Sequence, residues 1–348
     1  MFGAVLPRLS ARLSPRAAAR SADRPAAAVP RLAAATGDGA GWRQRDEAIM
    51  GTSIEVELWS ESAALGEAAI DAVMAEMHRI DRAMSPHKAD SELSRINRDA
   101  GRGAVALSAE MAALLARAQA FAHVTDGAFD ITYAAVGRLY DYRRKTRPDA
   151  AALERARAAV GWRKLELDAR AGTVRFAVPG MCIDLGGFAK GHAVDNAAAI
   201  LRGMGIRHAN VAAGGDSRVI GDRRGRPWTI GIRDPRRSAR VVAMLPLEDV
   251  SVSTSGDYER YFDERGERFH HLIDPATGKS PAGVHSVTVL GSDGLTTEAL
   301  SKAVFVQGVD KGLALIEAQR DVDAVVVDAA GALHHSSGFF APSSRPNR

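Results

Sequence analysis

The feature that most restricts the fold is an abrupt change of hydrophobic period. From Thr52 to Leu58, apolar and polar residues alternate, which predicts a strand with one buried face. From Ala63 to Met84, apolar residues recur every three or four positions, which predicts an amphipathic helix. The chain therefore needs both a sheet and helices that cover it.

The rest of the chain repeats both patterns without a strict βαβ rhythm. Strands are expected within 174–183, 208–213, 228–232, 250–254, 284–290 and 323–328. Further helices are expected after the capping residue Ser108 and over 186–201, 297–306 and 311–319, whereas 85–106 is polar and turn-rich. These patterns predict an α+β (mixed α/β) fold, a mixed sheet with packed helices.

Several classes of protein are excluded by composition. The single cysteine, Cys182, rules out an internal disulfide framework and a cysteine-rich zinc site. No run of about 18 apolar residues exists, so no transmembrane segment is expected. The net charge is +4, but residues 1–45 hold eight arginines and two acids, which leaves the remainder slightly acidic. Nucleic acid is therefore not an expected partner.

Composition also divides the chain. Residues 1–46 are rich in Arg, Ala and Pro and have few large apolar residues, so we predict a disordered tail. The apolar stretch Met1 to Pro7 is short for a secretion signal, and no lipid-anchoring cysteine is present there. Residues 47–340 are expected to form one domain, and 341–348 a flexible C-terminus.

The strongest chemical signal is the segment from Asp184 to Gly191. It places an acid at a strand end, Gly186-Gly187 at the turn, and Lys190 one turn into the following helix. Glycines permit close backbone approach, and the helix N-terminus and lysine favour a phosphate or another anion. A tight turn with a surface lysine fits the same residues.

Three further segments have weaker signals. They are Gly214-Gly215-Asp216, the run from Ser253 to Arg260, and the run from His270 to Gly278. A histidine such as His271, before an apolar pair and a turn, can serve as a general base or as a structural hydrogen-bonding group.

In their order along the chain, these segments resemble the ApbE family of FAD:protein FMN transferases. The resemblance spans about residues 48 to 330. It rests on Met50-Gly51-Thr52, Met84-Ser85, 90–97, 127–132, 184–191, Gly214-Gly215-Asp216, Trp228 with Gly231-Ile232, 254–258, 271–278 and 298–301.

The resemblance implies an ApbE-like, T-fold-like structure with two lobes around a flavin cleft. It implies Mg²⁺-dependent transfer of the FMN moiety of FAD to a threonine hydroxyl of a partner flavoprotein, with release of AMP. The residues implied to contact FAD are Met50, His87, Ala128, Phe129, Asp130, Asp184, Lys190 and Leu272. Those implied at the Mg²⁺ site are Gly187, Glu298, Ser301 and Lys302.

At the metal block the chain departs from the family pattern. The family usually has Asp-Ala-Leu-x-Thr, whereas this chain has Glu298-Ala-Leu-Ser301-Lys302. Glutamate still offers oxygen to a hard cation, but Mg²⁺ tolerates misplaced ligands poorly. Mg²⁺ binding is expected to be retained, with Lys302 pointing away or supplying charge that the metal normally supplies.

The threonine nucleophile requires a general base, and His271, Asp274 and then Asp257 are the candidates. Two other functions stay open: an FAD pyrophosphate hydrolase that yields FMN and AMP, and a flavin-binding carrier with a weakened metal site. The resemblance implies a periplasmic or inner-membrane-associated location, whereas the chain's own residues suggest a cytoplasmic one.

Overall fold

The computed structural model describes residues 39–235 and 237–340. The predicted flexible C-terminus and most of the predicted disordered tail lie outside the described residues. The tail boundary at residue 46 was wrong, because strand β1 already runs over Gly41–Ile49. It pairs along its whole length with β2 (Thr52–Ser60), and the Trp42 ring packs edge-on against Trp59 and Trp228. This strand was not predicted because it contains arginines at 43 and 45, which resemble the Arg-rich composition of the tail.

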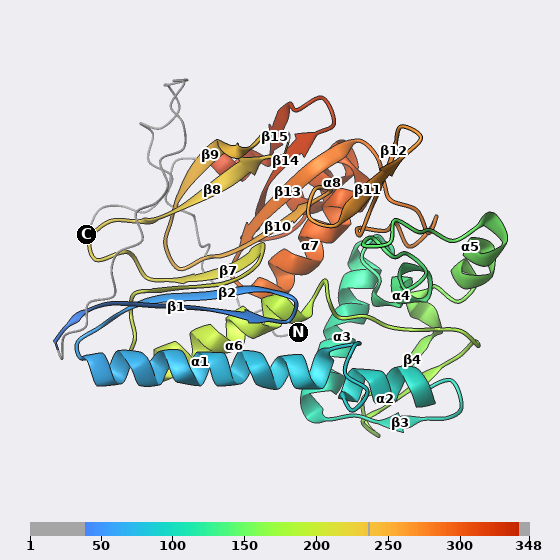
Figure 1. Ribbon diagram of the computed structural model, residues 1–348, viewed down its shortest axis with the longest axis horizontal. Helices are drawn as coiled ribbons and strands as arrows, with labels where there is room; N and C mark the ends of the chain where they lie inside the picture. Colours follow the sequence, from blue (N-terminus) through green and yellow to red (C-terminus); the bar gives the residue numbers. More distant parts are fainter. Residues whose placement is uncertain (1–38, 236, 341–348) are drawn as a thin grey trace, which may run out of the picture.

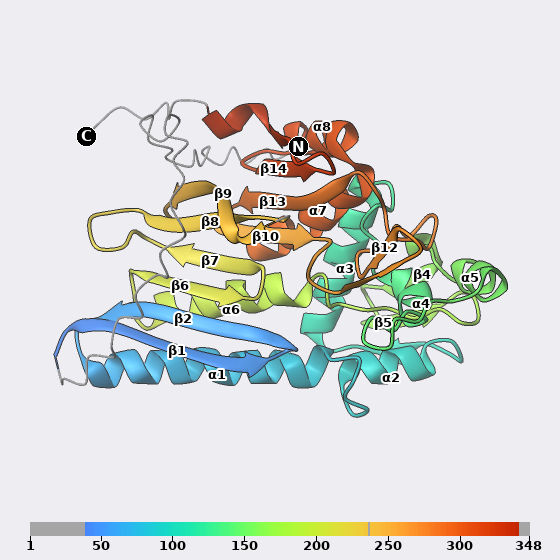
Figure 2. The ribbon, with the colours of Figure 1, turned by 45° about the horizontal axis from the view of Figure 1, so that its top comes forward.

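The described strands build one large sheet in which every neighbouring pair is antiparallel (Figure 2). Its order is β1-β2-β6-β7-β10-β13-β14-β15. The strands not yet bounded are β6 (Ala209–Ala213), β7 (Asp216–Ile220), β10 (Ser251–Gly256), β13 (Val284–Gly291), β14 (Asp323–Asp328) and β15 (Leu333–His335). The expected α+β class is confirmed, and the pairing within the expected mixed sheet is antiparallel.

Four helices cover one face of this sheet (Figure 1): α1 (Ala63–Met84), α6 (Ala189–Gly203), α7 (Gly294–Gln307) and α8 (Val309–Glu317). The predicted helix over 63–84 is confirmed. Its apolar stripe is buried, and Ser62 Oγ accepts a hydrogen bond from the Leu65 N–H at its start. The hairpin of β8 (Trp228–Asp234) and β9 (Arg237–Leu247) lies over the opposite face, where Trp228 and Leu247 join the sheet's Val252 in a second core.

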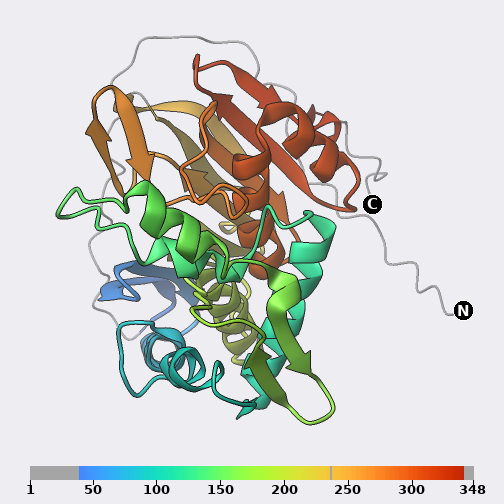
Figure 3. The same ribbon diagram turned by 90° about the vertical axis from the view of Figure 1, so that its right-hand side faces the viewer.

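A smaller part of the molecule flanks one end of the sheet (Figure 3). It contains α2 (Glu92–Asp99), β3 (Val105–Ala106), α3 (Ala109–Val124), α4 (Ala134–Gly137), α5 (Ala150–Arg157), β4 (Leu165–Asp168) and β5 (Thr173–Phe176). A short hairpin of β11 (Tyr261–Glu264) and β12 (Glu267–His270) lies beside it. Helix α2 falls in the segment that was expected to be only turn-rich. Ser91 caps it, and Leu93 and Ile96 are its buried residues, too few to stand out in the sequence.

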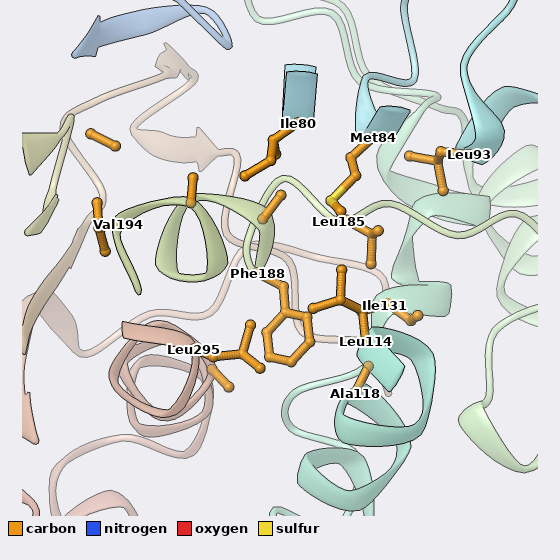
Figure 4. Packing of buried hydrophobic residues seen from close by; sticks show 14 of the residues in the cluster. Ile80, Met84, Leu93, Leu114, Ala118, Ile131, Leu185, Phe188, Val194 and Leu295 are labelled. Carbon is orange, nitrogen blue, oxygen red and sulfur yellow. The ribbon is translucent and has the colours of Figure 1, made fainter. Parts of the chain in front are cut away.

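One hydrophobic core joins the smaller part to the sheet and its helices. Figure 4 shows Phe188 at the centre of this junction, surrounded by side chains from α3, α7 and the segment before α6. The Phe188 ring lies 5.3 Å from the Phe129 ring and 6.0 Å from the Phe121 ring. The turn that leads into α6 is therefore anchored in the core.

Helices α6 and α7 approach so closely that only glycine fits at their crossing. A Cβ atom built on Gly191 would lie 2.2 Å from the carbonyl oxygen of Gly294. The two helices also cap each other. Asp195 of α6 accepts hydrogen bonds from the Gly294 and Leu295 N–H groups, and Glu298 of α7 accepts one from the Gly191 N–H.

In the described part of the chain, no helix has the length and apolar character needed to cross a membrane.

The crossing predicts that Gly191→Ala destabilises the fold. The added methyl group must displace backbone of α7, so we expect a net loss of at least about 1 kcal/mol in the free energy of unfolding, measured by chemical denaturation. Gly203→Ala is the matched control, because a Cβ at this end of α6 meets no atom within 4 Å. Equal stabilities of the two variants would contradict the assigned crossing.

Candidate active site

The turn before α6 is held by hydrogen bonds from three segments. Asp184 Oδ1 accepts from the Gly186 N–H at 2.5 Å, and the Asp184 N–H donates to the Ile131 carbonyl at 3.0 Å. The Asn97 side chain of α2 pairs with both the N–H and the carbonyl of Ile183, at 2.8 Å each. Helix α2, which the sequence did not predict, thus fixes the start of the 184–191 segment.

Lys190 lies at the centre of an ion cluster at this turn. Its Nζ lies 2.9 Å from Asp216 Oδ2, pairs closely with Glu298 Oε1, and donates to the Gly186 carbonyl at 3.0 Å. Burial alone would lower the pKa of Lys190, but the charges of Asp216 and Glu298 outweigh it and raise that pKa. Although burial raises the pKa of Asp216, the charges of Lys190 and Lys302 lower it overall.

Lys302 belongs to the same cluster. Its Nζ lies 3.3 Å from Glu298 Oε1, and its Cε lies 3.4 Å from where a Cβ of Gly187 would stand. The exposed side-chain fractions are 0% for Glu298 and 3% for Asp216, against 20% for Lys190 and 18% for Lys302. The carboxylates are therefore buried, and the two lysine side chains are the partly exposed part of the cluster.

Buried hydroxyl groups complete the floor of the cluster. Ser301 Oγ donates to the Glu298 carbonyl at 2.9 Å and lies within hydrogen-bond distance of Ser253 Oγ and Ser255 Oγ. Ser253 in turn donates to Asp216 Oδ1 at 2.5 Å. Two β10 serines and helix α7 are thus joined in one buried network.

The residues expected to bind Mg²⁺ do not fit a hard cation in this arrangement. Glu298 Oε1 is bonded to two ammonium groups, and Oε2 accepts from the Gly191 N–H. Ser301 is held within the serine network, and Lys302 brings a positive charge to the place where the cation is expected. Within residues 39–235 and 237–340, no three His, Cys, Asp or Glu side chains gather in a metal-binding group.

His271 lies near the lysine pair. Burial, followed by the charges of Arg260, His270, Lys302 and Lys190, lowers the pKa of His271 to about 3. Its ring is therefore neutral at pH 7. Its Nδ1 is buried and has no hydrogen-bond partner among the described residues, and its backbone N–H donates to the Arg260 carbonyl at 3.0 Å.

The two aspartates proposed as bases are engaged elsewhere. Asp274 closes a turn, because its carboxylate accepts from the Ala276 N–H and the Thr277 hydroxyl, both at 2.9 Å. Asp257 pairs with His285 Nδ1 at 2.8 Å and with Arg268 at 3.5 Å. Neither carboxylate bonds to the lysine cluster, whereas His271 lies close enough for the charges of Lys302 and Lys190 to act on its ring.

The residues expected to contact FAD differ in their exposure, from a surface loop to the hydrophobic core. Met50 stands at the β1–β2 turn with φ of 55°, where Arg260 reaches the carbonyl of the neighbouring Gly51 at 3.4 Å. His87 is exposed in the loop after α1, and Ala128 is half-buried against the core. Phe129 and Leu272 are buried in the two hydrophobic clusters on the helix side of the sheet.

Asp130 has a local structural role. Its carboxylate accepts from the Thr132 N–H and hydroxyl and from the Trp162 N–H, all within 2.8 Å. Burial raises the pKa of this carboxyl group despite these bonds. Asp130 therefore ties its own segment to Trp162, with both oxygens occupied, and the neighbouring Ile131 carbonyl makes the contact with the Asp184 turn.

Sequence reasoning left several residues out of the site. Asp216 was noted after a glycine pair, and Arg260 and Ser253 lay in a noted segment, but none was assigned a role. The sequence signal for Asp216 was an acid and a glycine pair directly after an expected strand. In the structure its carboxylate is buried and pairs with Lys190. Nothing local in the sequence gives that partner, which lies 26 positions away.

A separate hollow of about 490 Å³ opens beside α6 and the N-terminus of α7. Its walls include Arg117, Asp195 and Arg218, and none of the residues expected to bind FAD or metal. The lysine cluster is therefore distinct from this hollow.

The fold and the cluster together define an α+β protein with a buried lysine–carboxylate cluster at a glycine turn before a helix. Among known families, residues 50–326 match the model of the ApbE family. The chain belongs to the ApbE family, as its sequence motifs predicted.

Several relatives support this assignment over most of their length. The FAD:protein FMN transferase of Treponema pallidum is 33% identical over 316 residues, which cover 85% of this chain and 87% of the relative. That of Haemophilus influenzae is 35% identical, with coverage of 77% and 81%. The crystal structure of the ApbE protein of Thermotoga maritima has a TM-score of 0.80 at 33% identity and covers 86% of this chain and 98% of that one.

The neutral His271 predicts a specific pH dependence of stability. The pKa of His271 is about 3 in the folded chain, below the ordinary value of 6.5. Below pH 6.5 the unfolded chain therefore binds a proton at His271, whereas the folded chain does not. As the pH falls from 7 to 5, this proton uptake lowers the free energy of unfolding of the wild type by up to about 2 kcal/mol.

We therefore expect His271→Gln to lose less unfolding free energy over that range than the wild type, measured by urea denaturation. His87→Gln, which changes an exposed imidazole, should keep the wild-type slope. If the unfolding free energy of His271→Gln changes with pH as steeply as that of the wild type, His271 is not held buried and neutral.

Proposed function

We propose that this chain is an FAD:protein FMN transferase. It transfers the FMN moiety of FAD to a threonine hydroxyl of a partner flavoprotein and releases AMP. The threonine oxygen forms the new bond to the FMN phosphorus, the bond between the two phosphates breaks, and the hydroxyl proton passes to a base. The names of the curated relatives support the transferase class. The observation that carries the proposal is the pair of partly exposed lysine side chains, Lys190 and Lys302, that meet on Glu298 beside the glycine turn.

Phosphoryl transfer depends mainly on positioning and on neutralising negative charge. In this proposal the FAD diphosphate lies against the turn, where Lys302 offers N–H donors and both lysines offer positive charge, since the N–H groups of Lys190 are already bonded to Asp216, Glu298 and the Gly186 carbonyl. Asp184 shapes the turn by accepting from Gly186. Mg²⁺ was expected from the resemblance, but because Glu298, Ser301 and Lys302 do not fit it, no step is assigned to a metal.

His271 is the proposed general base. Its ring is neutral at pH 7 and its Nδ1 lacks a protein partner among the described residues, so it can accept a proton. The nearby positive charges of Arg260 and the two lysines favour release of that proton afterwards. Asp274 and Asp257 remain alternatives whose carboxylates must first leave their present partners.

The flavin and the acceptor complete the proposal. Met50, His87, Ala128, Phe129, Asp130 and Leu272 remain the proposed flavin contacts, with Met50 supported by its left-handed backbone at a turn beside Arg260. The acceptor is a flavoprotein with an accessible threonine. A periplasmic or membrane-associated location is proposed by resemblance, with the cytoplasm as alternative, and cell fractionation distinguishes them.

Replacing His271 should slow transfer without abolishing FAD binding. The full chain is incubated with FAD and a candidate acceptor, and the acceptor's intact mass and the released AMP are measured. We expect His271→Ala to lower the transfer rate by at least about 100-fold, the usual scale for a lost acid–base group. His334→Gln, on the edge strand β15, is the control that should retain wild-type rate.

Two controls separate this function from its alternatives. An acceptor whose target threonine is replaced by alanine should stay unmodified. Rapid AMP release in the absence of any acceptor would instead indicate an FAD pyrophosphate hydrolase. Stoichiometric FAD binding with no AMP release would indicate a flavin carrier. A His271→Ala rate within a few-fold of the wild type would remove His271 from the mechanism.

A further inference from the structure

Two ammonium groups share one carboxylate oxygen at the site. Lys190 Nζ and Lys302 Nζ both bond Glu298 Oε1. Like charges this close repel each other, and the arrangement is tolerable because Glu298 and Asp216 lie buried beneath them. A dianion that bound beside the lysines would relieve the repulsion and gain charge-assisted contacts with Lys302.

Lys302 occupies a particular place in the cluster. It lies one helical turn after Glu298 on α7, and its side chain passes beside Gly187 before reaching Glu298. Of the residues that the resemblance assigns to a metal, Glu298 bonds the Lys302 ammonium group and Gly187 lies beside the Lys302 side chain. The place expected for a divalent cation already holds a fixed positive charge.

We propose that Lys302, together with Lys190, takes the place of the divalent cation, so that the diphosphate of FAD binds this chain without Mg²⁺. The inference rests on the proposed function, since it assumes FAD as the ligand. An ammonium has three N–H donors, and among the described residues Lys302 uses one of them, on Glu298. Its remaining donors are available for phosphate oxygens at the partly exposed surface of the cluster.

The surrounding charges support this assignment. Lys190 and Lys302 carry two positive charges, and Asp216 and Glu298 balance them, so the cluster is neutral before FAD binds. Because the carboxylates are buried and the lysine side chains are partly exposed, an approaching ligand meets positive charge before it meets the carboxylates. An added Mg²⁺ would face two ammonium groups at close range and no free carboxylate oxygen on Glu298.

The test measures FAD binding by isothermal titration calorimetry with the full chain, once in EDTA and once with excess Mg²⁺. We expect dissociation constants that agree within about threefold, because the cation contributes no required contact. Binding only in the presence of Mg²⁺ overturns this inference and leaves the proposed function intact. Absence of FAD binding under both conditions overturns the inference and the proposed function together.

Variants at Lys302 make the same test residue-specific. In EDTA, Lys302→Ala should weaken FAD binding at least about tenfold, the scale of a lost hydrogen bond to a charged group. Lys302→Thr removes the ammonium but supplies a hydroxyl, so its weakened binding should recover partly on addition of Mg²⁺. Lys311→Ala, an exposed lysine of α8, controls for the loss of one positive charge.

Folding of the variants is checked by thermal melting. Glu298 keeps its bonds to Lys190 and to the Gly191 N–H when Lys302 is replaced, so the buried carboxylate stays paired. The Lys302→Ala variant overturns the assignment of Lys302 to the diphosphate site if it melts at the wild-type temperature and binds FAD in EDTA as tightly as Lys311→Ala.

Discussion

The close crossing of α6 and α7 at Gly191 and Gly294 is the constraint on which the site depends. Because neither position has a side chain, the two helix N-termini meet, and each donates an N–H group to a carboxylate of the other helix. Glu298 is thereby buried directly beneath Lys190. A helix pair held even one methyl group further apart would leave this carboxylate without its backbone partner and would move Lys302 away from Gly187.

The same crossing arranges charge in layers. A buried carboxylate requires compensation, and the two lysines provide it while their ammonium groups stay near the surface. The interaction that stabilises the fold thus also presents positive charge to a ligand. The turn before α6 is fixed independently, since Asn97 holds Ile183 and the Phe188 ring is buried in the core (Figure 4).

Local patterns in the sequence predicted much of the fold, including the helix over 63–84, the Ser108 cap and the strand over 323–328. They missed β1 and α2, because arginines interrupt the first and only two buried residues mark the second. The segment around Lys190 was recognisable from its glycines, but its partners were not. The pairing of Lys190 with Asp216 and Glu298 depends on long-range packing, and the position of Lys302 depends on a helix crossing that no local pattern encodes.

The central claim is that the lysine pair on Glu298 forms the diphosphate site of this ApbE-family chain. A crystal structure of the FAD complex, grown without divalent cations, tests it most directly. The account predicts phosphate oxygens within hydrogen-bond distance of Lys302 Nζ and next to Lys190, beside the Asp184 turn. A diphosphate bound away from these two ammonium groups would contradict it.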